Sequence, residues 1–277
     1  MKNILLPTDF SENSLNAIEY ALEFFKNWEC EFYVLNVQKP SEYITDDIMT
    51  ASPSESIHSA IAGDNKSKLQ QLVNDLNKKY ASTPFKINML FDFDNLSEAI
   101  NQIIQNHSIE LIVMGTNGAT NAREVVFGSN TIQVIRNVNC PILAIPQDYR
   151  FKGNNKTLLC IPKEIDLLDT ILTPFKDLMQ VHNSELHIIE FDDDALAVSE
   201  GQENSELKKS FNDYPFDYYC LNEQIEWSVI DTATQLLKTD LNAVFIEKKS
   251  FFERLILGTE TPKITYRTKV PVLFLKK

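Results

Sequence analysis

The sequence predicts an α/β protein built as two tandem five-stranded parallel-sheet domains with flanking helices. Two observations lead to this prediction. Short apolar runs alternate with amphipathic helical patterns along all 277 residues, and the pattern of the first half returns in the second. Strands that alternate with helices form parallel sheets covered on both faces.

The first half begins with a short apolar run, read as a buried strand because strands covered on both faces are continuously apolar. Ser11 can cap the helix that follows, in which Leu15, Ile18 and Leu22 share one face. The strands expected in this half are residues 4–7, 31–37, 85–91, 111–114 and 141–145, and further helices are expected over 66–80, 96–104 and 128–138. The polar segment 40–64 shows no period and is expected to be a long loop with at most one helix.

The second half follows the same plan. Its expected strands are residues 158–161, 185–189, 217–221, 243–246 and 271–275, with a helix marked by Ile225, Val229, Leu236 and Leu237 between the third and fourth strands. In sheets of this kind, ligands bind beyond the carboxyl ends of the strands.

The internal repeat defines the expected domains. The segment 4–9 (ILLPTD) resembles 159–164 (LCIPKE), and Pro141 and Pro271 each lie 13 residues after a glycine that is followed by a hydroxyl residue. The Gly-Asn-Asn turn signal at 153–155 indicates the joint. We therefore expect a nucleotide-binding domain over 1–147 and a degenerate copy of it over 155–277.

Composition and charge exclude several classes of protein. The chain is 43% hydrophobic, which is enough for a substantial core. Its formal net charge of −13 argues against a general nucleic-acid binder. No apolar run is long enough for a transmembrane helix, so no membrane role is expected. The four cysteines show no CxxC spacing, and the simplest compartment is the reducing cytoplasm.

Three of the seven glycines fall between residues 115 and 128, in the pattern G-x-x-G, nine residues, G-S. Gly115 and Gly118 follow a predicted strand, while Gly128 and Ser129 open a predicted helix. Glycine lets a ligand approach the backbone closely, and free amides at a helix start attract phosphate. The alternative is that these glycines only form turns. The spacing matches neither the Walker pattern nor the Rossmann fingerprint.

With this motif and the strand-ending segment 7–9, the chain resembles the universal stress protein family in its tandem two-domain form. The resemblance implies an adenine nucleotide alpha hydrolase-like fold and binding of ATP in the first domain. It implies that the motif residues surround the phosphates and ribose, that Asp9 lies by the nucleotide, that Val37 offers backbone groups to adenine, and that three more residues line the pocket. The implied site residues are Pro7, Thr8, Asp9, Val37, Met114, Gly115, Gly118, Gly128, Ser129, Asn130 and Thr131.

Asp9 has a second interpretation, because an acid after a strand can simply stabilise the start of the next helix. Near phosphates, Asp9 would need to contact ribose hydroxyls or a metal such as Mg²⁺, so the metal remains an open question. Arg123 can approach phosphate or lie solvated on the surface.

The second half lacks the motif. Alignment places Glu247 at the position of Gly115, and the side chain and charge of Glu247 oppose phosphate binding. We expect this half to be structural and to pair with the first. The apolar final strands of the two halves can pair with each other or across a homodimer.

Other groupings are weaker. His182 and His187 are expected to be ordinary surface or partly buried residues, the acidic run 192–194 a solvated turn, and the pair 251–252 either core or a cover over an empty site.

The function expected from the sequence is a cytoplasmic stress-response protein that binds ATP in its first domain and acts as a nucleotide-dependent switch. No general base is evident, so efficient catalysis is not expected. Two alternatives stay open. One is a slow metal-dependent ATP hydrolase or phosphoryl transferase that uses Asp9, and the other is an interaction scaffold without a ligand.

Overall fold

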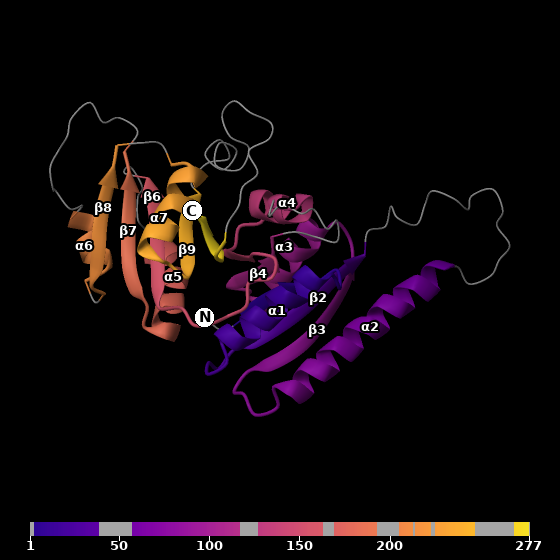
Figure 1. Cartoon of the computed structure of the whole chain (residues 1–277). Helices are drawn as coiled ribbons and strands as arrows, with labels where there is room; N and C mark the ends of the chain where they lie inside the picture. The colour runs from indigo at the N-terminus through magenta and orange to yellow at the C-terminus, as the bar shows by residue number, and fades with distance from the viewer. Residues whose placement is uncertain are drawn as a thin grey trace.

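The structure is a computed structural model, shown in Figure 1. It describes residues 3–38, 57–116, 127–162, 169–192, 205–212, 214–222, 225–246 and 269–276. Predictions that involve Gly118, Arg123, Glu247 or the pair 251–252 lie outside these residues.

The described residues of the first half form five strands and four helices. The strands are β1 (Asn3–Pro7), β2 (Glu31–Gln38), β3 (Lys86–Phe93), β4 (Leu111–Gly115) and β5 (Ile142–Ile145). The helices are α1 (Glu12–Phe24), α2 (Ile57–Lys79), α3 (Leu96–His107) and α4 (Ser129–Asn137). Ser11 is the N-cap of α1, as its position in the sequence predicted, and its side chain accepts a hydrogen bond from the Ser14 N–H.

The second half repeats this arrangement. Its described strands are β6 (Lys156–Pro162), β7 (Glu185–Phe191), β8 (Phe216–Leu221), β9 (Leu241–Ile246) and β10 (Val272–Lys276). Its described helices are α5 (Asp169–His182), α6 (Ser205–Ser210) and α7 (Trp227–Leu237). Figure 1 shows the two halves side by side, with β1 to β4 in indigo to magenta and β6 to β9 in orange tones.

All ten strands belong to one sheet, in the order β3-β2-β1-β4-β5-β10-β9-β6-β7-β8. Each half therefore has the same internal order, and the two halves meet at their final strands. Strands β5 and β10 pair antiparallel, with Leu143 opposite Leu273, whereas the other neighbouring strands pair in parallel. Of the two pairings that the sequence left open for the final strands, the structure contains the one within the chain.

The hydrophobic core runs across both halves on each face of the sheet. One cluster joins residues of α1 and α2 to residues of α5 and α6, and includes Phe24 and Phe175. The other joins α3 and α4 to α7, and includes Val134 and Ile230. Successive strand residues face opposite clusters, since Leu5 belongs to the second and Leu6 to the first. The continuous cores tie the halves together.

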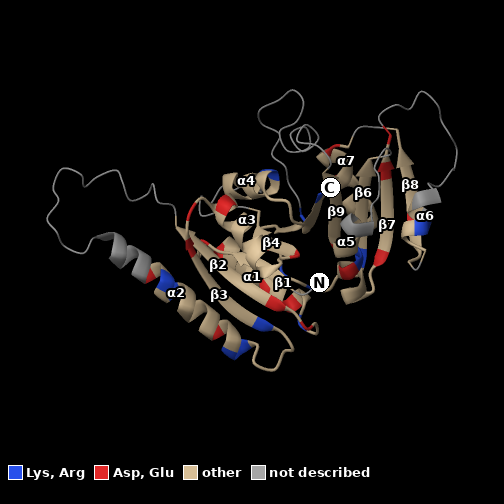
Figure 2. Cartoon of the chain, turned by 180° about the vertical axis from the view of Figure 1, so that it is seen from behind, with Lys and Arg blue, Asp and Glu red and all other residues tan. Residues whose placement is uncertain are grey.

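The helices depart more from the sequence predictions than the strands do. Helix α2 starts at Ile57, nine residues before the predicted start, in a segment where alanines favour helix despite Gly63. Helix α5 was not predicted, and Pro174 inside it interrupts a helical reading of the sequence. Among the described helices, none combines the length and apolar character needed to span a bilayer. Figure 2 shows acidic and basic residues interleaved over the described parts of both halves.

Candidate functional site

An open cleft lies at the carboxyl ends of β1, β2 and β4. Its lining comes from these strands, from α1, from the first turns of α3 and α4, and from the residues that directly follow β1. The lining residues are Pro7, Thr8, Asp9, Ser14, Val37, Leu96, Met114, Gly115, Asn130 and Thr131.

The position of the cleft follows from the strand order. The chain leaves β1 for β2 on one side, while β4 pairs with the other side of β1. The connections therefore diverge between β1 and β4. A crevice opens at such a switch point in a parallel sheet, outside the carboxyl ends of the strands.

A hydroxyl pair fixes the segment that follows β1. The Thr8 and Ser14 hydroxyl oxygens are 2.9 Å apart, and the Phe10 N–H donates to the Thr8 hydroxyl at 3.0 Å. The Thr8 N–H donates to the Leu35 carbonyl oxygen at 2.7 Å. Phe10 adopts a left-handed φ of 63°, which makes the tight turn into α1. Thr8 is therefore held rigidly at the cleft floor.

Asp9 is exposed at the cleft and is engaged locally. Its Oδ1 accepts hydrogen bonds from the Ser11 N–H at 3.0 Å and from the Ser11 hydroxyl at 2.5 Å. Asp9 thus holds Ser11, the residue that caps α1, in place. This contact agrees with the interpretation in which Asp9 stabilises the start of the helix. Both of these bonds use Oδ1.

Gly115 allows close packing between β4 and α1. A Cβ atom at this position would lie 2.5 Å from Asn13 Nδ2 and 2.7 Å from Asn13 Cγ, which is closer than atoms can approach. The sequence analysis gave ligand approach as the reason for a glycine here. The structure supplies a different reason, because the close neighbour is a side chain of the same protein.

The start of α4 lies beside the cleft and has a glycine as its N-cap. Its N-cap is Gly128, which supplies no side-chain hydrogen bond. The Gly128 N–H donates to the Thr116 carbonyl oxygen at 2.6 Å, and the Thr131 hydroxyl donates to the Gly115 carbonyl oxygen at 2.9 Å. These bonds anchor the helix start to the end of β4. The first-turn amides of α4 carry the partial positive charge of the helix dipole.

Apolar side chains form one wall of the cleft. Val37 lies near the end of β2, Met114 near the end of β4 and Leu96 at the start of α3. Asn36 of β2 ties that strand to the segment after β1, because its side-chain N–H donates to the Thr8 carbonyl oxygen at 2.7 Å. The cleft thus combines an apolar side with a polar side formed by Thr8 and the start of α4.

The structure brings most of the residues singled out in the sequence to this cleft. Pro7, Thr8, Asp9, Val37, Met114, Gly115, Asn130 and Thr131 all line it. Gly128 and Ser129 precede Asn130 at the start of α4 but are not lining residues, and Gly118 lies outside the described residues.

Sequence reasoning missed two lining residues, Ser14 and Leu96. Both lie in the first turns of helices that follow strands of the sheet, Ser14 in α1 after β1 and Leu96 in α3 after β3. The general rule that ligands bind at the carboxyl edge also brings helix starts to that edge. Applied to α1 and α3, it could have identified both.

Comparison with known proteins identifies the family. The model of the Universal stress protein family matches residues 1–146, which is more than half of the chain. The chain belongs to the universal stress protein family. Universal stress proteins MJ0531 and MJ0577 of Methanocaldococcus jannaschii are each 28% identical to it, over 144 and 158 residues. Each alignment covers 52% of this chain, with 81% of MJ0531 and 94% of MJ0577.

A solved universal stress protein matches this chain over both of its halves. It comes from Archaeoglobus fulgidus, is 20% identical and has a TM-score of 0.71. The match covers 99% of this chain and 98% of that one, so the tandem architecture has a counterpart of nearly equal extent.

Proposed function

We propose that this universal stress protein binds ATP in the cleft of its first half and acts as a cytoplasmic nucleotide-dependent switch. Under this proposal, the segment 1–147 is the nucleotide-binding domain and the segment 155–277 is a structural partner. The proposed role does not include efficient catalysis.

The observation that carries the proposal is the start of α4, whose N-cap Gly128 has no side chain to cap it, beside a cleft with an apolar wall. An anion at a helix start is stabilised by free amides and by the helix dipole. A phosphate group near Asn130 would meet this arrangement, while Val37 and Met114 offer an apolar surface that suits a purine ring.

The anchoring of the cleft supports the proposed switch. The start of α4 is hydrogen-bonded to Gly115 and Thr116 at the end of β4, so a ligand that orders this helix start also acts on the sheet. A ligand shifts a conformational equilibrium by the difference in its affinity for the two states. ATP would therefore favour the conformation in which the cleft is fully formed.

The proposal is tested by a substitution that places a negative charge where the phosphate is expected. Asn130 occupies the second helical position of α4, where an acid stabilises the helix. Asn130→Glu should therefore keep or raise thermal stability while it repels ATP, with a loss of affinity of at least about tenfold. Gln133→Glu is the matched control, because Gln133 is exposed one turn along the same helix.

Calorimetric titration of ATP with Mg²⁺ should give one site per chain in the natural protein and in Gln133→Glu. Equal affinity in Asn130→Glu would place the ligand elsewhere. Two sites per chain would show that the second half also binds, and no binding by the natural protein would leave the scaffold interpretation.

A further inference from the structure

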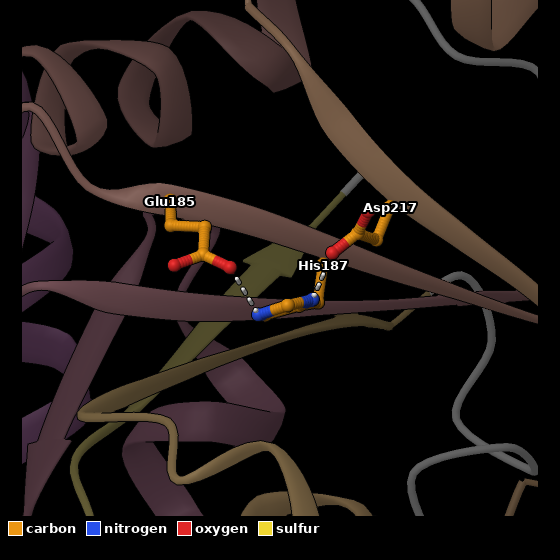
Figure 3. Close-up of side chains that lie close together, drawn as sticks. All are labelled: Glu185, His187 and Asp217. Carbon is orange, nitrogen blue, oxygen red and sulfur yellow. Dashed lines mark ion pairs between the residues drawn. The ribbon is translucent and has the colours of Figure 1, made fainter.

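The second half contains a cluster of metal-ligating side chains far from the cleft in the sheet order. Glu185 and His187 lie on the same face of β7, separated by one residue, and Asp217 on β8 is the direct register partner of His187. Figure 3 shows the imidazole ring between the two carboxylates. The group lies at the amino ends of these strands, whereas the cleft lies at carboxyl ends.

The prediction that His187 is a surface or partly buried residue is wrong, because its ring is packed inside the second half. The residue is 3% exposed, and neither ring nitrogen makes a hydrogen bond within the part of the chain that the structure describes. Nε2 is 3.4 Å from Glu185 Oε1, and Nδ1 is 3.2 Å from Asp217 Oδ2. Both separations are within ion-pair distance but lack hydrogen-bond geometry. A buried polar group in this state needs a partner.

We propose that this cluster binds a divalent transition-metal ion of the zinc type. Imidazole together with carboxylate is a donor set that suits Zn²⁺ and related ions rather than Mg²⁺ or Ca²⁺. One donor atom from each residue lies within 4.8 Å of the others. Bonds from zinc to these donors are about 2.0–2.2 Å long, so two ligands of one ion lie roughly 3–4 Å apart. The two nitrogen–oxygen separations already match that spacing.

The two carboxylates take different roles, because they face opposite nitrogens of one ring. A histidine that binds a metal through one nitrogen donates the N–H of the other to an acceptor such as a carboxylate. Lys156 Nζ lies 3.3 Å from Glu185 Oε2, and its charge disfavours a cation on that side. The ion therefore binds His187 Nδ1 and Asp217, with water completing its shell, and Glu185 Oε1 faces the Nε2 side of the ring from 3.4 Å.

Zinc titration against a chromogenic chelator, without nucleotide, tests this assignment. The background variant is Cys220→Ser, because Cys220 is an exposed thiol that could bind zinc by itself. One zinc per chain is expected. Asp217→Asn and His187→Gln should each weaken binding at least tenfold, and His107→Gln, which alters a histidine of the first half, should leave it unchanged.

Lys156→Met should have the opposite effect on zinc affinity. Removal of the neighbouring positive charge should tighten zinc binding, on the order of threefold. Asp217 is 60% exposed on its side chain, so Asp217→Asn should fold normally even if His187→Gln does not. Absence of zinc binding in the background variant, or equal affinity in folded Asp217→Asn, would overturn the proposal.

Discussion

The Phe127 and Trp227 rings lie 6.0 Å apart between centroids, and this contact joins the two halves of the chain. Phe127 directly precedes the N-cap of α4, and Trp227 is the first residue of α7. Both rings also contact Phe274 of β10, with centroids 5.6 and 6.4 Å away. The candidate phosphate-binding end of α4 is therefore packed directly against the second half.

This contact makes Trp227 a reporter of the cleft. Ligand binding at the start of α4 should move Phe127 relative to Trp227 and change the fluorescence of the indole. The measurement uses Trp28→Phe, which leaves Trp227 as the one remaining tryptophan. Its emission should change with ATP and saturate at the concentration that saturates the calorimetric signal. Calorimetric binding without any change in emission would show that the second half does not sense the cleft.

Phe274→Ala tests whether the halves unfold as one unit. Phe274 is fully buried in β10 and touches rings from both halves. Its truncation should lower the free energy of unfolding by about 3–5 kcal/mol. Because the core clusters run through both halves, urea unfolding should keep a single transition monitored by far-UV circular dichroism.

Leu236→Ala is the control for that substitution, since Leu236 is 77% exposed on α7. It should change stability by no more than about 0.5 kcal/mol. Two separate transitions in Phe274→Ala, one for each half, would contradict the continuous core.

Gly115→Ala tests the packing explanation for the motif glycine. The added methyl group would collide with the Asn13 side chain, and the overpacking should cost about 1–3 kcal/mol. Asn13→Ala removes the two closest atoms, so the double variant should recover part of that loss in a double-mutant cycle. Chemical denaturation of the four proteins measures the coupling.

The substitutions Gly115→Ala and Asn13→Ala also distinguish two explanations for the glycine, close packing and close approach of a ligand. If Gly115 serves packing, the double variant should bind ATP with nearly the natural affinity. A stable double variant that no longer binds ATP would restore the interpretation in which the glycine makes room for the nucleotide.

The fold was largely predictable from the sequence, because buried parallel strands appear as continuous apolar runs. All ten described strands begin and end within two residues of their predicted positions. Helix α5 was not predicted because Pro174 interrupts the helical pattern of its sequence. The choice of β10 as the partner of β5, and the close approach of Asn13 to position 115, depend on contacts between distant segments. Local sequence pattern carries no direct signal for such contacts.

His182 makes stability depend on pH at a second junction between the halves. Its ring packs against Phe24 of α1 and against Phe151, with centroids 4.3 and 5.1 Å away, and its Nε2 is 3.0 Å from the Phe24 carbonyl oxygen. Burial lowers the pKa of His182 below its usual 6.5, and the hydrogen bond to Phe24 opposes this shift only in part.

The sign of the effect follows from proton binding. Below pH 6.5 the unfolded chain takes up a proton at His182 before the folded chain does, so the free energy of unfolding falls as pH falls through that range. Urea denaturation between pH 5 and 8 should show a steeper loss of stability in the natural protein than in His182→Gln. The slope that a single group contributes cannot exceed about 1.4 kcal/mol per pH unit. Parallel profiles for the two proteins would mean that the histidine at this junction takes up its proton equally in the folded and unfolded chain.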